Sequence, residues 1–326
     1  MIKDELTIVG GGAAAITLIK ELRAQNPTVK IRLLDRQQYS FDKEHYFDHV
    51  LSSSRVRPLY LTEFAKAHNI DFLVRTVERV QPNKKLLYCK NEEPLEYKTL
   101  ALACGLRSRP LEIKGESRDS AFYLDEPDLF FIKDILKVSR DIIILAHTLL
   151  GLRLAFSLSF LQKEIKLFTG PLRFLEPFAS EKERIFNLLR ERGIDIYENT
   201  AIEEIIGEAC VKAVKTSIPK VFAAQAVFID SGFICGHKLT DIVPQEKRFT
   251  TDYADVYMLG DMADLSIEDE SFFFTRARNV ELGAMRCARL FSSEESPQRP
   301  DVGLGSDQIK DFLKTEFNVE RRASLV

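Results

Sequence analysis

The sequence predicts an α/β fold that places two Rossmann-like, three-layer domains in one chain of 326 residues. A unit of strand, glycine turn, helix and strand opens the chain and ends at Asp35. A second unit of strand, helix and strand begins at Asp141, and short apolar runs typical of buried parallel strands recur between and after the two units. The length suffices for two domains.

The first unit is read from three neighbouring segments. The run Leu6–Val9 is short, apolar and rich in β-branched residues, as a buried parallel strand requires. Residues 13–24 carry apolar side chains at helical spacing, and the pair Asn26-Pro27 ends that pattern. Residues 29–34 then predict a second strand that ends at Asp35, which completes one βαβ unit.

The remaining elements follow from the same patterns. The polar and aromatic stretch 39–49 predicts a loop or short helix that lines a site. Further strands are expected at residues 72–74, 77–80, 85–88, 100–104, 142–145, 165–168, 194–197, 226–229 and 256–259. Helices are expected at residues 150–161, 181–192, 278–291 and 307–317.

Composition excludes several classes of protein. The apolar fraction of 45% and the charged fraction of 29% are ordinary for a soluble globular chain. A net charge of −3 gives no electrostatic reason to expect nucleic acid or an anionic membrane as a partner. The sequence has no apolar run long enough to span a bilayer, and its acidic N-terminus does not resemble a signal peptide. We therefore expect a cytoplasmic protein without a membrane partner.

The cysteines are scattered along the chain and form no CxxC pair and no zinc-ligand spacing. They are Cys89, Cys104, Cys210, Cys235 and Cys287. Free thiols in a reducing compartment are the expected state, and no metal site is predicted. The absence of a close pair argues against redox enzymes that work through a disulfide.

The first glycine turn has the pattern Gly10-x-Gly12-x-x-Ala15 between a strand and a helix. Gly10 permits a tight turn, Gly12 lets the backbone approach a pyrophosphate, and Ala15 allows close packing of helix on strand. The helix N-terminus offers free N–H groups and a partial positive charge to phosphates. Asp35, at the end of the second strand, is placed to accept hydrogen bonds from the hydroxyl groups of a ribose. The pattern therefore predicts a dinucleotide site.

Three motifs in order make the prediction more specific. After the glycine turn, a strand ends in Ala103-Cys104-Gly105 and is followed by Arg107 and Pro110. A later strand, residues 256–259, ends in Gly260-Asp261. In this order the motifs resemble the FAD-dependent pyridine nucleotide–disulfide oxidoreductase family, nearest the branch of the NADH:rubredoxin reductases and nitrite reductase flavin domains. In that resemblance Cys104 stands where the family has threonine.

The resemblance implies FAD as cofactor and an NAD(P)-type domain inserted into a split FAD domain. The implied boundaries are 1–115 for the first FAD segment, 116–235 for the inserted domain, and 236–326 for the second FAD segment with the C-terminal tail. Asp261 would hold the ribityl chain, and the backbone of Val77 would contact adenine. The candidate cofactor-binding residues are Gly10, Gly12, Ala13, Ala14, Ala15, Asp35, Arg36, Ser40, Val77, Ala103, Cys104, Gly105, Arg107, Gly260 and Asp261.

The glycine turn of the second unit is degenerate, because residues 146–151 read Ala-His-Thr-Leu-Leu-Gly. Thr148 puts a β-branched side chain where backbone should meet a pyrophosphate, and we expect it to exclude the phosphates sterically. The next strand ends without the acid that binds an NAD ribose. Two alternatives follow. NAD(P)H binds weakly or in a shifted pose, with His147 and Arg153 at its phosphates, or the domain keeps its fold and has lost the nucleotide.

These features predict an FAD-dependent oxidoreductase that moves electrons between a donor, NAD(P)H by resemblance, and a small protein or small-molecule acceptor. The alternative is a non-enzymatic or complex-bound flavoprotein that has lost NAD(P)H binding. Lys43 is the candidate that stabilises negative charge on reduced flavin, and residues 272–274, all phenylalanine, are a candidate aromatic lid or docking face. Little chain follows Ser296, so the family's interface domain, and with it the usual dimer, is not expected.

Overall fold

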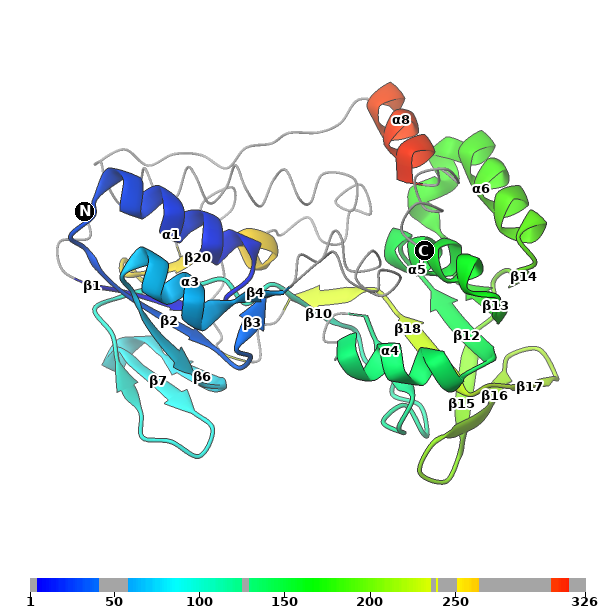
Figure 1. Cartoon of the computed structure of the whole chain (residues 1–326), viewed down its shortest axis with the longest axis horizontal. Coiled ribbons are helices and arrows are strands. Elements are labelled where there is room, and N and C mark those ends of the chain that lie inside the picture. Colours follow the sequence, from blue (N-terminus) through cyan, green and yellow to red (C-terminus); the bar gives the residue numbers. More distant parts are fainter. Residues whose placement is uncertain are drawn as a thin grey trace. The chain divides into compact units, whose positions relative to one another are not determined.

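The computed structural model describes residues 5–40, 58–124, 129–235, 239, 251–263 and 306–316. The chain divides into two compact units. Unit 1 takes its described residues from Met1–Glu44, Pro58–Leu106 and Cys235–Gly303, and unit 2 takes its own from Arg107–Ile234 and Leu304–Val326. Each unit is built around one five-stranded parallel sheet (Figure 1).

The sheet of unit 1 has the strand order β20-β9-β1-β2-β5, and every neighbouring pair in it is parallel. Its strands are β1 (Glu5–Val9), β2 (Lys30–Asp35), β5 (Asp71–Val74), β9 (Thr99–Leu102) and β20 (Val256–Met258). The central strand β1 pairs Val9 with both Leu34 and Leu102. The carboxyl ends of β1, β2 and β9 therefore meet at one edge of the sheet.

Two layers cover this sheet. Helices α1 (Ala13–Gln25) and α3 (Leu61–His68) pack on one face through Leu18, Leu61 and Phe64 (Figure 1). An antiparallel sheet of β6 (Val77–Gln81), β7 (Leu86–Cys89) and β8 (Leu95–Glu96) packs on the other face. A short two-stranded antiparallel sheet of β3 (Tyr39–Ser40) and β4 (Leu59–Tyr60) lies beside α3. Unit 1 is thus a three-layer structure, as the sequence predicts.

Unit 2 repeats this plan in four of its five parallel strands, and its fifth strand, β11, comes before the others in the chain, whereas β20 comes last in unit 1. Its parallel sheet has the order β11-β18-β12-β13-β14, with β12 at the centre. The strands are β11 (Ala121–Tyr123), β12 (Asp141–Ala146), β13 (Glu164–Thr169), β14 (Asp195–Tyr197) and β18 (Ala226–Asp230). An antiparallel sheet of β15 (Ile202–Gly207), β16 (Val211–Thr216) and β17 (Val221–Ala223) again forms the third layer.

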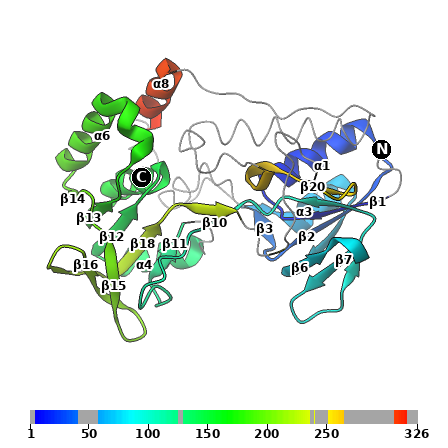
Figure 2. The same cartoon turned by 180° about the vertical axis from the view of Figure 1, so that it is seen from behind.

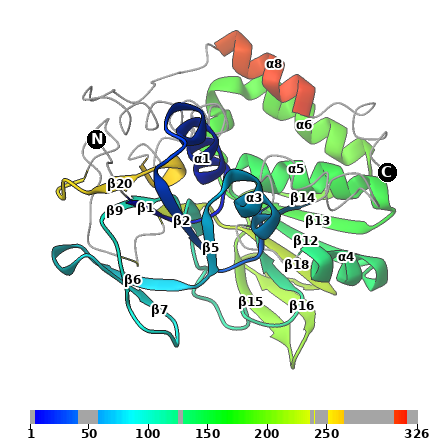
Figure 3. The same cartoon turned by 60° about the vertical axis from the view of Figure 1, so that its left-hand side comes forward.

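The helices of unit 2 complete its layers (Figures 2 and 3). Helix α5 (Leu149–Leu158) contacts β12, β13 and β18 and is buried along nearly its whole length, as its almost continuous apolar sequence requires. Helix α4 (Leu129–Val138) precedes β12, and α6 (Ala179–Glu191) precedes β14. Single 3₁₀ turns fill the connections at Ser159–Leu161 and Arg173–Phe178.

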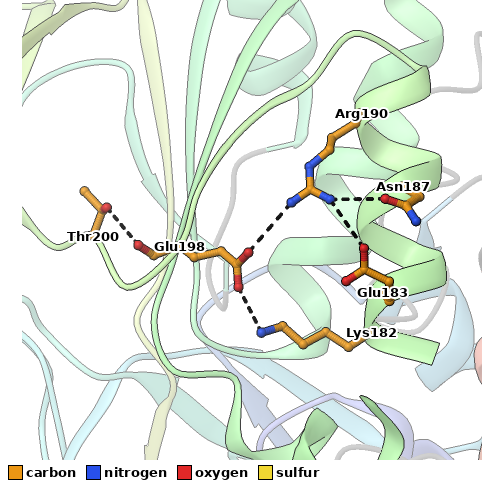
Figure 4. Close-up of polar contacts among 6 residues, drawn as sticks. All are labelled: Lys182, Glu183, Asn187, Arg190, Glu198 and Thr200. Carbon is orange, nitrogen blue, oxygen red and sulfur yellow. Dashed lines mark hydrogen bonds and ion pairs between the residues drawn. The ribbon is translucent and has the colours of Figure 1, made fainter. Parts of the chain in front are cut away.

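An ion-pair network ties α6 to the residues after β14 (Figure 4). The Glu198 carboxylate lies 2.9 Å from Lys182 Nζ and 3.7 Å from the Arg190 guanidinium. Arg190 also donates to Asn187 Oδ1 at 3.2 Å and lies 4.0 Å from Glu183. Such half-exposed pairs contribute little stability individually, so the network mainly fixes the orientation of α6 against β14.

Two strands and one terminal helix complete the described chain. Strands β10 (Leu106–Ser108) and β19 (Phe233–Cys235) follow β9 and β18 and pair with each other as a two-stranded sheet. Helix α8 (Ser306–Glu316) buries Ile309 and Leu313. None of the helices in the described ranges is long and apolar enough to cross a membrane.

The α/β fold class predicted from the sequence is confirmed, and several elements differ in detail. Residues 39 and 40, predicted as loop or helix, form β3 because they pair with Leu59 and Tyr60. The sequence reading missed α3, α4 and the sheet β15–β17. The helix expected at 278–291 lies outside the described residues.

Phe168 is the aromatic centre of the layer contact in unit 2. It is fully buried on β13 and packs against Tyr197 and Phe222 at ring distances of 5.1 Å each. We expect Phe168→Ala to lower the free energy of unfolding by about 3–5 kcal/mol, because it removes the ring and leaves a cavity. Val221→Ala, at a 55% exposed position on β17, is the matched control and should cost less than about 0.5 kcal/mol. Urea unfolding followed by circular dichroism measures both, and equal losses would contradict this assignment of the core.

Candidate functional site

The carboxyl edge of the unit 1 sheet brings most of the predicted residues together. The glycine turn follows β1, Asp35 ends β2, Ala103-Cys104-Gly105 follows β9, and Gly260-Asp261 follows β20. Backbone hydrogen bonds hold this edge, from Gly10 to the Leu34 carbonyl and from Ala103 to the Val9 carbonyl, both at 2.8 Å. In open parallel sheets, ligands bind outside this edge, so it is the candidate dinucleotide site.

Gly10 makes the tight turn between β1 and α1. Its φ of +102° lies in the region that only glycine adopts easily. A Cβ at this position would lie 2.5 Å from the carbonyl oxygen of Ala103, the residue directly after β9. The role predicted for Gly10 thus has two physical causes, the backbone conformation and the close approach of β9.

Gly12 faces open space. It is the N-cap of α1 in an extended conformation, and a Cβ placed there would meet no atom of the described chain within 4 Å. Within the described part of the chain, no side chain caps α1, and the first turn of α1 carries no acid. The first amides of an α-helix have no partner inside the helix, so the N-terminus of α1 offers donors and a partial positive charge to an anion. This geometry fits a pyrophosphate group.

Asp35 braces the turn through both carboxylate oxygens. Its Oδ2 accepts from the Gly11 N–H at 2.6 Å, and its Oδ1 accepts from the Gln37 N–H at 2.8 Å. Each carboxylate oxygen has two acceptor positions, so half-exposed Asp35 keeps capacity for the hydroxyl groups of a ribose. The side chain therefore orders the loop in addition to the role predicted for it.

The other two motifs touch each other. The Cys104 N–H donates to Met262 Sδ at 3.2 Å, and the Cys104 thiol donates to the Val9 carbonyl at 3.4 Å. Met262 belongs to the 3₁₀ turn Gly260–Ala263, in which Asp261 is buried. The segments at Cys104 and Asp261, 157 positions apart in the sequence, thus form one corner of the edge.

The remaining predicted residues lie around this edge or away from it. Ala14 and Ala15 are buried in α1, Ala13 is exposed, and Val77 is buried at the start of β6. Arg36 is exposed after β2, and Ser40 is half-buried in β3. Arg107 is exposed on β10 and belongs to unit 2. Lys43, His45, His49 and residues 272–274 lie outside the described residues.

The corresponding edge of unit 2 is filled by the chain itself. Thr148 caps α5, and its hydroxyl accepts from the Leu150 N–H at 3.2 Å. The Asp230 carboxylate, at the end of β18, accepts from the N–H groups of Thr148 and Gly151 at 2.8 and 2.9 Å. The Thr148 side chain was expected to exclude phosphates by its bulk alone. The structure shows in addition that the amides themselves are occupied, and it is Asp230, missed in the sequence, that occupies them.

Of the two basic residues considered for a shifted nucleotide pose, Arg153 is buried and His147 is half-buried. Arg153 is 6% exposed within α5. The His147 ring packs against Gly170, where a Cβ would lie 2.9 Å from its Cδ2 atom. Burial lowers the pKa of His147, with the Asp230 carboxylate and the backbone of Ser231 opposing that shift. His147 is therefore poorly suited to hold a phosphate as a cation.

The two repeated units, one with an open glycine turn, define an α/β protein of the two-domain dinucleotide-binding class. The family model described as pyridine nucleotide-disulphide oxidoreductase matches residues 4–282, and the chain belongs to this family of FAD-dependent oxidoreductases. The family expected from the three motifs is thereby confirmed.

Relatives are distant. The biphenyl dioxygenase system ferredoxin–NAD(+) reductase component of Paraburkholderia xenovorans is 23% identical over 236 residues, which are 70% of this chain and 58% of that protein. The nitric oxide reductase FlRd-NAD(+) reductase of Aeromonas hydrophila is 24% identical over 215 residues, which are 64% and 55% of the two chains. The chain thus spans less than two thirds of the length of either relative.

A similar solved structure is the ferredoxin reductase for the CYP199A2 system from Rhodopseudomonas palustris. It superimposes with a TM-score of 0.75 at 16% sequence identity, and the match covers 93% of this chain and 79% of that one. At this identity the likeness concerns the fold, and it agrees with the two parallel sheets described above.

Gly10 and Gly12 should respond differently to the same substitution. We expect Gly10→Ala to destabilise the flavin-free protein by about 1–3 kcal/mol or more, since it combines a strained φ with a backbone clash. Gly12→Ala should cost no more than about 1 kcal/mol, the scale of a helix-cap change, because its Cβ meets open space. Thermal unfolding of both variants measures this. Equal destabilisation would show that the turn is not built as described.

Proposed function

We propose that the chain is an FAD-dependent oxidoreductase that moves electrons between a donor and a small protein or small-molecule acceptor. The observation that carries this proposal is the uncapped N-terminus of α1 behind the open position at Gly12. Membership in the family supports FAD as the dinucleotide. By the same resemblance NAD(P)H is the donor in this first candidate function.

The FAD domain would comprise residues 1–115 and 236–326, with the nucleotide-type domain 116–235 between them. The amides of residues 12–15 would bind the pyrophosphate, and Asp35 the adenosine ribose. Asp261 would meet the ribityl chain, and Lys43 would stabilise negative charge near the ring. When bound, FAD supplies the hydride and electron chemistry, and these residues bind and orient it.

The partner is proposed from the relatives. The names of two relatives include ferredoxin and FlRd as redox partners of NAD(+) reductases. A small redox protein is therefore the first acceptor to test, and a small molecule the second. A cytoplasmic location remains part of the proposal.

The second candidate function is a flavoprotein that works within a complex, or without catalysis, after losing NAD(P)H binding. The observation that favours it is the Asp230 carboxylate on the amides of Thr148 and Gly151. Under this reading the flavin exchanges electrons with a partner protein, and unit 2 is a structural domain.

A visible spectrum followed by anaerobic reduction tests both candidates. The purified protein is expected to be yellow, or to become so with added FAD, and to bleach with dithionite. Bleaching by NADH or NADPH at catalytic rates selects the first candidate. A yellow protein that only dithionite reduces selects the second. A colourless protein that FAD does not reconstitute contradicts both.

Gly12→Ala tests where the flavin binds. Its methyl group points into the space assigned to the pyrophosphate, so we expect FAD affinity to fall at least tenfold, which corresponds to about 1.4 kcal/mol. Flavin content after desalting and a fluorescence titration of the flavin-free protein measure the change. Ala24→Ser, at an exposed position near the other end of α1, is the control that leaves the turn unchanged. Unchanged affinity in Gly12→Ala would place the flavin elsewhere.

A further inference from the structure

Four parallel strands of each unit can be compared position by position, because β9-β1-β2-β5 and β18-β12-β13-β14 have the same spatial order and the same order along the chain. The N-caps align Gly12 with Thr148, since α1 begins at Ala13 and α5 at Leu149. The strand registers then align the end of β9 with the end of β18, because Val9 pairs with Leu102 and Leu145 pairs with Ile229. A glycine of positive φ lies three positions after each of the aligned residues Leu102 and Ile229, Gly105 at +70° and Gly232 at +82°.

This alignment places Asp230 where unit 1 has Ala103. The methyl group of Ala103 in unit 1 therefore corresponds to the carboxylate of Asp230 in unit 2. This carboxylate contacts the N-terminus of α5, the helix that follows the central strand β12. In unit 1 the position aligned with Thr148 opens onto empty space. In unit 2 that position carries the Thr148 side chain, and the Asp230 carboxylate, which is 1% exposed, lies against the Thr148 amide and hydroxyl.

Asp230 satisfies the donors that a pyrophosphate would need. Its Oδ2 accepts from Thr148 N at 2.8 Å, from Thr148 Oγ1 at 2.8 Å and from Gly151 N at 2.9 Å. The Thr148 hydroxyl accepts from Leu150 N, so the amides of Thr148, Leu150 and Gly151 are all engaged. An anion from solution would have to displace a carboxylate that is covalently part of the chain and already in place.

The carboxylate also lies directly against the helix backbone. A Cβ at Gly151 would come within 2.8 Å of Asp230 Oδ2 and 2.6 Å of Ala146 Cβ. The glycine that survives in the degenerate turn therefore makes room for Asp230 and for β12. Burial raises the pKa of Asp230, while its hydrogen bonds with Thr148 and Gly151 and the nearby His147 lower it.

A second side chain closes the neighbouring strand end. The His147 ring packs over Gly170, the residue that follows β13. In unit 1 the equivalent strand β2 ends in Asp35, which braces the turn and keeps free acceptor positions. Unit 2 thus fills with its own side chain the place where unit 1 offers its helix N-terminus, and it has Thr169 where the strand register of unit 1 puts Asp35.

We infer that Asp230 is an internal replacement for a nucleotide pyrophosphate, and that it closes unit 2 to nicotinamide dinucleotides. This inference deepens the second candidate function and rests on the proposed function only for the choice of NADH and NADPH as ligands. Asp230 also explains two features of the degenerate turn: Gly151 is kept because a side chain there would clash with Asp230, and Thr148 stands in place of a glycine because its hydroxyl donates to Asp230. Electrons then reach the chain from a donor that does not use unit 2, such as a reduced redox protein.

Binding to the full-length wild-type chain is the first test. Isothermal titration with NADH and NADPH is expected to give no saturable binding up to about 1 mM, the upper end of ordinary substrate affinities. Hydrogen exchange of the peptide spanning residues 146–152 should be slow and unaltered by either nucleotide. Saturable binding in the micromolar range, with added protection of this peptide, would overturn the inference.

The double variant Asp230→Ala with Thr148→Gly copies the residues of unit 1 into unit 2. We expect faster exchange at residues 148–151 and at least tenfold tighter NADH binding than in the wild type. Asp230→Asn is the matched control, because its amide oxygen keeps an acceptor of the same shape and removes the charge, and it should remain closed. A folded double variant that binds NADH no better than the wild type would refute the role of Asp230. Flavin content, measured in the same samples, reports separately on the proposed function.

Discussion

The first backbone amides of a helix that starts at the edge of a parallel sheet need hydrogen-bond acceptors. This requirement determines how the strand–helix turn is built in both units. The helices α1 and α5 each begin directly after the central strand of a five-stranded sheet, where their N–H groups have no partner inside the helix. In unit 1 the turn is held open by Gly10 and Asp35, and the amides face outward. In unit 2 an aspartate of the adjacent strand meets the same need. The same constraint thus has two solutions, an open helix N-terminus in unit 1 and one capped by Asp230 and Thr148 in unit 2.

The strands and the first strand–helix junction could be predicted from the sequence because they depend on residues that are close together in the chain. Apolar runs such as Leu6–Val9 and Ile142–Leu145 have no polar alternation, so they indicate strands covered on both faces. The glycine turn gave the first strand–helix junction correctly for the same reason, since each residue acts on its immediate neighbours. The antiparallel layer β15–β17 was missed because its residues 202–223 alternate only weakly and carry many charges.

The candidate site was predicted only in part, because some of its contacts join distant segments. Asp230 ends a strand predicted to stop at Ile229, and in the sequence it resembles an ordinary solvated strand end. Its partners Thr148 and Gly151 are 82 and 79 positions away. Only the strand register of β12 with β18 brings them together. A signal was nevertheless present, since Asp230-Ser231-Gly232 is the counterpart of Ala103-Cys104-Gly105 with an acid in place of the methyl group.

If a dinucleotide binds at Gly12 as proposed, the stability of unit 1 depends on the concentration of that ligand. A group that binds only the folded state stabilises it by RT ln(1 + [L]/Kd), which amounts to about 2.7 kcal/mol at a hundredfold excess over Kd. Unit 1 gains this term when a dinucleotide is present and loses it on dilution. Unit 2 carries its acceptor as residue 230 of the chain and has no such dependence. On this proposal, withdrawal of the cofactor would weaken unit 1 and leave unit 2 unchanged, so unit 1 would unfold first in the apo-protein.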